Sequence, residues 1–261
     1  MKITVLGCHG SDQVLDDPEP ARTCGTCGFL INDLLLVDAG TVGRALTLDA
    51  QRAIQGVLLS HVHFDHIQGL PTLADNRAAH SPPLSIAGLP EVLAGLRSHI
   101  FNDTVYPDFF RLPTQDQPTL RPHPLTPGES VMMAGFHITP IRVNHLVPAA
   151  GFLISDGRAT VLYSGDTHQT DELWRRAREM PDLAAAFIET SYPNHLEDLA
   201  ARSKHLTPRL LQTEFQKLGR PDLPLYVYHL KPRFKQVIME ELQALSIPRL
   251  SVLDDGQGIT L

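Results

Sequence analysis

The feature that most constrains this chain is the string SHVHFDHIQG, which places His61, His63, Asp65 and His66 directly after an apolar run at residues 56–60. A short, continuous apolar run is typical of a strand buried on both faces. Residues two apart in an extended segment point the same way, so His61 and His63 can bind one metal ion together. Asp65 and His66, at the turn into a following helix, can face a second ion. Neutral imidazole and carboxylate groups suit zinc and neighbouring borderline metals.

The alternative interpretation is that these histidines are ordinary surface or core residues. The chain contains 13 histidines, so isolated histidines carry little information. This four-residue pattern, however, arises by chance on the order of once in several hundred such sequences. We therefore interpret the string as part of a metal site.

Further candidate ligands stand at the ends of three later apolar runs. His145 ends PIRVNH, Asp166 lies in YSGDT, and His229 ends YVYH. Folds of the α/β class place functional residues at the ends of strands. Each of these residues alone could be a hydrogen-bonded structural residue, but together they complete two coordination spheres.

Strand-like and helix-like segments alternate along the chain, which predicts an α/β protein. Strand-like runs cover residues 2–7, 28–40, 56–61, 137–145, 151–155, 159–166, 184–189, 223–229 and 249–253. Helical patterns cover residues 89–100, 171–180 and 234–245, and another helix is expected to begin at Thr207-Pro208 and to end at Gly219. The two strand-rich halves indicate two sheets with helices outside, within one domain of residues 1–261.

The charge of the chain limits its partners. The formal net charge is −7 and no stretch is a basic run, which disfavours long nucleic acid as a ligand. A small anionic substrate remains compatible, because bound metal ions supply local positive charge. A homodimer is left open.

The amino-terminal sequence MKITVLG lacks the apolar stretch of a secretory signal, and no window is long and apolar enough to span a membrane. Three cysteines do not make a disulfide framework. We therefore expect a cytoplasmic protein without a membrane partner. Cys24 and Cys27 are expected to be small residues of a tight loop beside the site, and a zinc knuckle completed by Cys8 and His9 is the alternative.

The order HxHxDH, a lone histidine, an aspartate in SGDT and a late histidine resembles the metallo-β-lactamase superfamily. The resemblance implies a four-layer αβ/βα sandwich of two mixed β-sheets flanked by helices. It implies one metal bound by His61, His63 and His145, a second bound by Asp65, His66 and His229, and Asp166 bridging both. True zinc β-lactamases have cysteine at the Asp166 position and the flavodiiron branch has glutamate at the His63 position, so neither antibiotic hydrolysis nor oxygen reduction is expected.

A narrower resemblance is to the class II cyclic-nucleotide phosphodiesterases. It rests on SHVHFDHIQGL, HIFNDTVYPDF, VNHLVPAAGF, YSGDT, ETSYPN, SKHLTP and YHLKP. The first and the YSGDT segments also occur in the transfer-RNA 3′-processing endonucleases. The resemblance implies a metal-dependent hydrolase that converts 3′,5′-cyclic nucleotides, cAMP or cGMP, to 5′-monophosphates. Two divalent ions are expected, zinc first, with manganese or iron as alternatives.

Three residues are predicted to take part in catalysis. His205 in SKHLTP is the candidate donor of a proton to the leaving oxygen, and Glu189 in IETSYPN is expected to orient it. This pair resembles the glutamate and histidine of the RNA-processing branch. Asp65 is counted with them as a carboxylate at the reacting centre. The alternative for His205 is that it only caps the helix that begins near Thr207.

Four residues are predicted to contact the substrate. Lys231 in HLKP, two residues after His229, can reach a phosphate as a point charge. Asn102, Tyr106 and Phe109 are candidates for the wall of a base pocket, since aromatic faces suit the stacking of purines. The alternatives are a surface lysine and the core of a helical flap.

Three other functions remain open. An RNA-processing nuclease of the same fold is disfavoured by the absence of a basic patch. A lactonase or small-ester hydrolase is compatible, because a metal site alone does not choose between carbon and phosphorus centres. A non-catalytic nucleotide-binding protein is disfavoured by the complete set of ligands.

Overall fold

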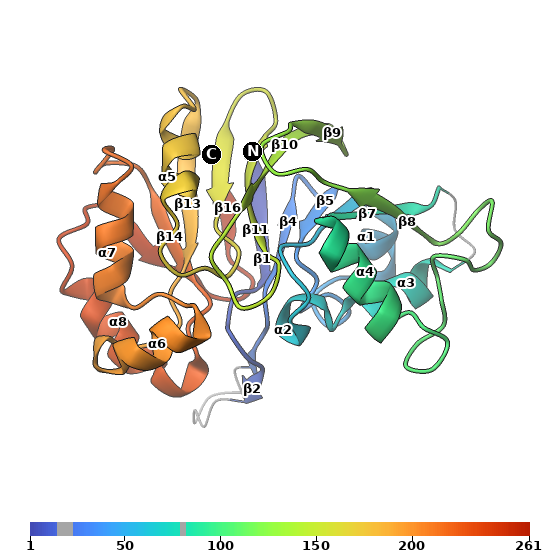
Figure 1. Cartoon of the computed structure of the whole chain (residues 1–261), viewed down its shortest axis with the longest axis horizontal. Helices are drawn as coiled ribbons and strands as arrows, with labels where there is room; N and C mark the ends of the chain where they lie inside the picture. The colour runs from blue at the N-terminus through green and yellow to red at the C-terminus, as the bar shows by residue number, and fades with distance from the viewer. Residues whose placement is uncertain (15–22, 79–81) are drawn as a thin grey trace.

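Two seven-stranded β-sheets form the centre of the protein, seen here in a computed structural model that describes residues 1–14, 23–78 and 82–261 (Figure 1). The strand order of the first sheet is β16 (Gly258–Thr260), β1 (Lys2–Gly7), β4 (Gly28–Ile31), β5 (Leu35–Val37), β6 (Gly56–Leu58), β7 (Leu84–Gly88) and β8 (Leu120–Pro124). That of the second is β15 (Leu250–Val252), β14 (Leu225–Tyr228), β13 (Leu183–Glu189), β12 (Thr160–Tyr163), β11 (Ala150–Ser155), β10 (Phe136–Arg142) and β9 (Val131–Met133). Both sheets are mixed: β5 to β8 and β12 to β15 are parallel runs, and the other neighbours are antiparallel.

Helices flank the two sheets on their outer sides (Figure 1). Those of the first half are α1 (Leu48–Ala53), α2 (Phe64–Ile67), α3 (Leu70–Arg77) and α4 (Pro90–His99). Those of the second half are α5 (Asp171–Arg178), α6 (Glu197–Ser203), α7 (Pro208–Gln216) and α8 (Lys235–Gln243). A short ribbon of β2 (Gln13–Val14) and β3 (Thr23–Cys24) lies apart from both sheets.

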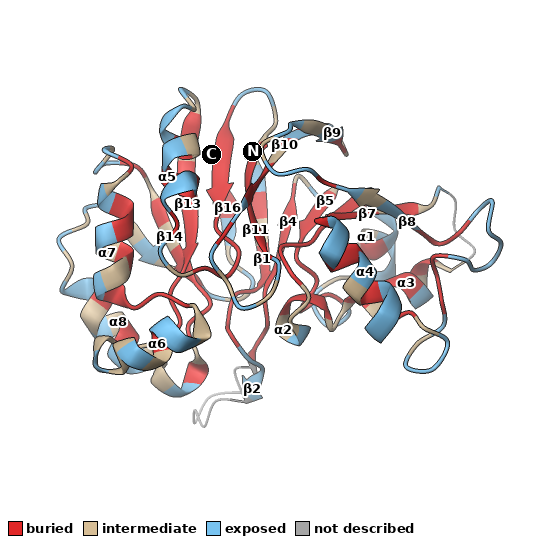
Figure 2. Cartoon of the chain, in the orientation of Figure 1, coloured by how far each residue is buried: buried red, intermediate tan, exposed pale blue. Residues whose placement is uncertain are grey.

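The central strands of the second sheet, β11 to β14, are mostly apolar because both of their faces are buried. Side chains alternate between faces along a strand. In β12, Val161 and Tyr163 pack in the core shared with the first sheet, whereas Leu162 packs under the outer helices. In β13, Phe187 likewise packs in the shared core and Ile188 packs under the outer helices. Figure 2 shows the consequence, with buried strands and helices that expose their outer faces.

The predicted fold, two mixed sheets flanked by helices, is confirmed. One predicted strand is wrong: residues 28–40 form the antiparallel hairpin of β4 and β5 instead of a single strand. Asn32 and Asp33 form its turn with φ of 48° and 61°. Asparagine and aspartate tolerate this left-handed conformation, which a two-residue hairpin turn requires.

The predicted helix starts are also observed. The Thr207 side chain accepts a hydrogen bond from the Leu210 amide and caps α7, which begins at Pro208. The helix ends at Gln216, and Gly219, with φ of 70°, forms the turn that follows. Within the described parts of the chain, no helix combines the length and apolar character needed to cross a bilayer.

Candidate metal centre

Four of the predicted ligands follow β6 on one short stretch of chain. His61 and His63 lie in the loop after the strand, and α2 then presents Asp65 and His66. The rings of His61 and His66 are buried and their centroids are 4.2 Å apart. The ring of His63 lies 4.7 Å from that of His61. The buried strand therefore delivers three imidazoles and one carboxylate to one place.

The other three predicted ligands come from the second sheet. His145 follows β10, Asp166 follows β12 and His229 follows β14. His145 Nε2 lies 3.1 Å from His63 Nδ1, and His229 Nε2 lies 3.3 Å from Asp65 Oδ2. The two groups of ligands thus meet at the seam between the sheets.

Asp166 lies between the two groups. Its Oδ1 is 3.3 Å from His66 Nε2, and its Oδ2 is 3.2 Å from His229 Nε2 and 3.7 Å from His61 Nε2. One carboxylate thus reaches imidazoles of both predicted coordination spheres. This is the position expected of a bridging ligand, and the assignment itself stays a prediction.

The donor atoms of this cluster fit metal ions. His61 Nε2 and Asp166 Oδ1 are buried and make no hydrogen bond with any described residue. His66 Nε2 and His229 Nε2 face each other at 3.3 Å, while their Nδ1 atoms lie 2.8 Å from Asp38 Oδ2 and Ser191 Oγ respectively. Buried polar groups are normally paired, and imidazoles fixed through Nδ1 present Nε2 to a metal. The cluster therefore fits divalent cations.

The pKa values of three predicted ligands, His61, His145 and Asp166, shift in the directions that suit ligation. Burial lowers the pKa of His61 well below its ordinary value and lowers the pKa of His145 to about 4, so both imidazoles are neutral at pH 7. Burial would raise the pKa of Asp166, but the charge of His229 outweighs it and holds that pKa well below its usual range. Metal ligation requires neutral imidazoles and ionised carboxylates.

Asp38 is a buried residue of the site that the sequence did not single out. It follows β5, accepts hydrogen bonds from the Ser60 amide at 2.8 Å and the Tyr163 hydroxyl at 2.7 Å, and lies 2.8 Å from His66 Nδ1. Burial alone would lower the pKa of His66, but the carboxylates of Asp166 and Asp38 outweigh it and raise that pKa. Asp38 thus fixes the orientation of His66. Its only sequence signal is a carboxylate at the end of an apolar run.

The predicted catalytic pair is in contact. Glu189 lies at the end of β13, and its Oε1 is 2.8 Å from Nδ1 of His205. The ring of His205 stacks on that of His229 with centroids 5.3 Å apart, and no described residue hydrogen-bonds its Nε2. Burial and the charge of Asp166 raise the pKa of Glu189 to about 8, and burial lowers the pKa of His205. Because Thr207 caps α7, His205 does not act as the helix cap.

Ser191 connects this pair with the predicted ligands. Its Oγ lies 3.0 Å from Glu189 Oε2 and 2.8 Å from His229 Nδ1. One hydroxyl can accept from the imidazole and donate to the carboxylate at the same time. Ser191 therefore holds His229 with Nε2 toward Asp166. Its position two residues after Glu189 is the only sign of Ser191 in the sequence.

His229 has an unusual backbone. Its φ is 68°, in the left-handed region, and its amide donates to the Cys8 carbonyl oxygen at 2.7 Å. Gly10 lies against its ring, where a Cβ would come within 2.9 Å of the imidazole Cε1. The end of β1 thus supports the last predicted ligand.

The predicted substrate contacts lie in two places. Lys231 donates from Nζ to the Gly10 carbonyl oxygen at 2.5 Å and lies 3.9 Å from Asp65 Oδ2, beside the cluster. Asn102, Tyr106 and Phe109 lie in the loop between α4 and β8. Asn102 Oδ1 accepts from two backbone amides of that loop, and Phe109, 6% exposed, packs in the core of the first half. A role for this loop in binding a base stays a prediction.

The three cysteines are free and buried. Cys27 Sγ lies with His66 Nε2 and His229 in a group whose donor atoms are all within 4.8 Å of one another, so Cys27 is next to the predicted second metal. Cys8 forms a similar group with His9 and Asp255. Burial is the largest cause that raises the pKa of both thiols well above the ordinary value. Buried thiols of this kind are inert.

The chain is similar in sequence to known proteins over most of its length. A sequence profile described as "Beta-lactamase superfamily domain" matches residues 34–223. A "Probable 3′,5′-cyclic-nucleotide phosphodiesterase" of Yersinia pestis is 28% identical over 228 residues, which is 74% of this chain and 63% of that protein. "Ribonuclease Z" of Mycobacterium bovis is 28% identical over 189 residues, which is 66% of this chain and 65% of that protein. The matched region thus spans less than two thirds of either relative.

Among solved structures, unliganded yeast PDE1 has a TM-score of 0.80 and 20% sequence identity, with 100% of this chain and 99% of that chain covered. At this identity the likeness concerns the fold alone.

Proposed function

This chain belongs to the beta-lactamase superfamily and is a metallo-hydrolase by that membership, and we propose that it hydrolyses 3′,5′-cyclic nucleotides to 5′-monophosphates within a single domain of residues 1–261. The proposal is supported by the similarity to the Yersinia pestis protein and by the acid pair beside the metal centre.

Two ions are proposed at the seam. One would be held by His61, His63, His145 and Asp166, and the other by Asp65, His66, His229 and Asp166. Divalent ions there, zinc first, would lower the pKa of water and compensate negative charge on the phosphate.

The contact between Glu189 and His205 supports hydrolysis of a phosphodiester, and the similarity to the Yersinia pestis protein favours a cyclic nucleotide as the substrate. A metal site alone serves carbon and phosphorus centres equally. Hydrolysis of a cyclic phosphate releases an alkoxide, which needs a proton as it leaves. His205 would donate that proton from Nε2, while Glu189 holds Nδ1. His205 Nδ1 lies 3.9 Å from Asp166 Oδ2, so the imidazole ring of His205 adjoins the predicted metal ligands.

Lys231 would position the substrate. Its ammonium group lies 3.9 Å from Asp65 Oδ2 and can contact a phosphate oxygen at the edge of the metal centre. With a formal net charge of −7, the chain favours a small anionic substrate over a long polyanion.

Processing of RNA is the second candidate, favoured by the similarity to the Mycobacterium bovis ribonuclease Z. The two candidates share the metal centre and the acid pair. They differ in the surface that a long RNA requires, because such RNA contacts many cationic side chains.

The test is a substrate panel with zinc-loaded protein: cyclic AMP, cyclic GMP, a precursor transfer RNA and a lactone. We expect at least one of the two cyclic nucleotides to be cleaved. Chromatography should identify the product as the 5′-monophosphate. Accumulation of the 3′-monophosphate would refute the proposed orientation. Cleavage of the transfer RNA alone would establish the second candidate.

A further inference from the structure

Phe64 is an exposed aromatic residue in the middle of the predicted ligands. It lies between His63 and Asp65 at the start of α2, and 64% of its surface is exposed. Phe64 belongs to neither of the two hydrophobic cores of the described residues. It lines a cavity of about 330 Å³ together with Asp12, Thr41, Arg44 and Gln68.

This cavity adjoins the metal centre. The Ala39 amide donates to the His66 carbonyl oxygen at 2.7 Å, so the loop that follows β5 is held against α2. A Cβ at Gly40, which lines the cavity, would lie 2.2 Å from the Asp65 carbonyl oxygen. The cavity thus borders α2 directly, and Phe64 in its lining stands in the chain between the predicted ligands His63 and Asp65.

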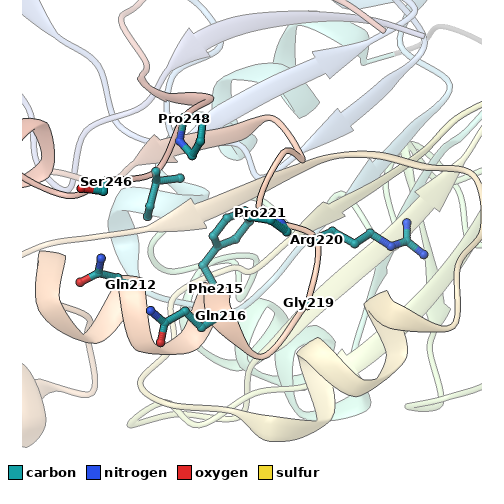
Figure 3. A pocket seen from close by; sticks show the side chains of 9 residues that line it. Gln212, Phe215, Gln216, Gly219, Arg220, Pro221, Ser246 and Pro248 are labelled. Atoms are coloured by element: carbon teal, nitrogen blue, oxygen red, sulfur yellow. The ribbon is translucent and has the colours of Figure 1, made fainter.

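A second cavity, of about 200 Å³, lies elsewhere (Figure 3). It is lined by residues around the end of α7, none of which is a predicted ligand. Its Arg220 extends away from the other lining side chains and donates to the Met180 carbonyl oxygen at 2.8 Å. The lining of the cavity beside α2 also contains no predicted ligand, but it includes Phe64, which stands in the chain between two of them, His63 and Asp65.

The cavity beside α2 is lined by both hydrogen-bond donors and hydrogen-bond acceptors. Thr41 is 4% exposed, and its hydroxyl has no hydrogen-bond partner in the described parts of the chain. Arg44 is half exposed and donates from Nη2 to the Cys24 carbonyl oxygen at 2.9 Å, which leaves further N–H groups available. Gln68 uses its amide nitrogen on Asp12 and keeps its oxygen as an acceptor.

These groups suit a neutral planar ligand. Arg44 lies 3.8 Å from the carboxylate of Asp12, so the positive charge is balanced and a second phosphate is not favoured. A nucleobase has donors and acceptors along its edge and an aromatic face. A phenyl ring such as that of Phe64 stacks on any base.

We propose that this cavity, called the α2 pocket and defined by Thr41, Arg44, Phe64 and Gln68, binds the base of the nucleotide. The proposal rests on the proposed function. Phe64 provides the stacking face, while the Gln68 oxygen and the available N–H groups of Arg44 contact the edge of the base. The loop that carries Tyr106 is the alternative location for the base, and one experiment separates the two.

The test is binding of AMP, GMP and ribose 5-phosphate to the zinc-loaded protein by calorimetry. We expect the wild-type protein to bind one or both nucleotides at least about 10-fold more tightly than ribose 5-phosphate, as one base stack implies. Phe64→Ala should lose most of this preference and Phe64→Tyr should keep it. The matched control is Leu146→Ala, which changes another exposed residue beside a predicted ligand, His145.

Three results would overturn the α2 pocket. Phe64→Ala could weaken ribose 5-phosphate as much as the nucleotides, which would mean that Phe64 supports the ligands instead. Tyr106→Ala could abolish the preference while Phe64→Ala leaves it intact. The wild-type protein could cleave cyclic nucleotides yet bind AMP and GMP no better than ribose 5-phosphate. The protein could also cleave no cyclic nucleotide and still prefer AMP or GMP over ribose 5-phosphate in a way that depends on Phe64. That result would refute the proposed function and support the α2 pocket.

Discussion

Oε1 of Glu189 and Nδ1 of His205 lie 2.8 Å apart, and both side chains are buried beside the predicted metal ligands. The contact occupies Nδ1 of His205 and leaves Nε2 as the nitrogen available for proton transfer. Neither residue belongs to the seven predicted ligands, so each can be substituted without removing a ligand. The first two predictions follow from it.

His205→Ala should slow the turnover of a cyclic nucleotide by roughly 10²–10⁴-fold, the contribution typical of a general acid. Bis(p-nitrophenyl) phosphate should lose far less, because nitrophenolate leaves without a proton. Steady-state kinetics and elemental analysis check both points. The control is His195→Ala, an exposed histidine in the short helix Asn194–Leu196. Equal losses on both substrates would mean that His205 is not the acid.

Glu189→Gln should change how the stability of the metal-free protein depends on pH. The pKa of Glu189 is raised to about 8 from an ordinary 4.5 by burial, so the folded state holds its proton more tightly than the unfolded state. This contribution is fully present below pH 4.5 and is lost as the pH rises to 8. The slope should approach about 1.4 kcal/mol per pH unit. Urea unfolding of both proteins at several pH values measures this slope. If the free energy of unfolding of the two proteins changes with pH in the same way, the raised pKa of Glu189 is contradicted.

Asp166→Ala should remove the carboxylate shared by both metal sites. We expect the protein to contain close to two metal equivalents and the variant clearly fewer, with turnover lost. Elemental analysis after dialysis without chelator gives the stoichiometry. Asp171→Ala, at the exposed start of α5, is the control and should retain both ions. Normal metal content in Asp166→Ala would exclude Asp166 as the bridge.

Ser191→Ala should weaken metal binding without removing a ligand. The loss of the hydroxyl frees His229 Nδ1, and residues that orient metal ligands typically contribute 10–100-fold to affinity. Competition with a chromophoric chelator measures the affinity. Ser191→Thr retains the hydroxyl and should restore most of it, while Ser203→Ala on α6 should have no effect. If Ser191→Ala binds metal normally, the ring of His229 is held by other contacts.

Removal of the metals should destabilise the fold, because the ligands come from both sheets. An ion at 100 times its dissociation constant stabilises by about 2.7 kcal/mol, which corresponds to a fall in Tm of about 5–10 °C on chelation. Differential scanning calorimetry with and without chelator measures the shift. Asp166→Ala should show a smaller one. An unchanged Tm would argue against metal binding at the seam.

The sequence predicted most of the fold because the strands are buried on both faces and read as continuous apolar runs. Where such runs are interrupted by a tight turn, the prediction was wrong. Residues 28–40 looked like one strand because Asn32 and Asp33 occupy only two positions between apolar residues. Strand β8 (LRPHP) was missed because it contains two prolines and is mostly exposed, and β7 was missed because it directly follows two prolines.

The candidate site was predictable as far as its residues lie at the ends of strands. The seven predicted ligands meet because strand ends of two sheets share one seam. Asp38 and Ser191 could not be found in this way. Asp38 acquires its role from contacts with residues as distant as Tyr163, which lies 125 positions away in the chain. Such contacts are properties of the tertiary packing and leave no local pattern.

The left-handed backbone of His229, with φ of 68°, is unfavourable for a histidine, although its imidazole is a predicted metal ligand. An L-residue in this region costs roughly 1–2 kcal/mol, and only glycine adopts it freely. A glycine at position 229 would relax the chain and delete the imidazole in one substitution. The imidazole is fully buried and stacks on the rings of His66 and His205, so the packing of the side chain opposes the gain from a relaxed backbone. Position 229 is therefore one at which the favourable backbone and the favourable side chain belong to different amino acids.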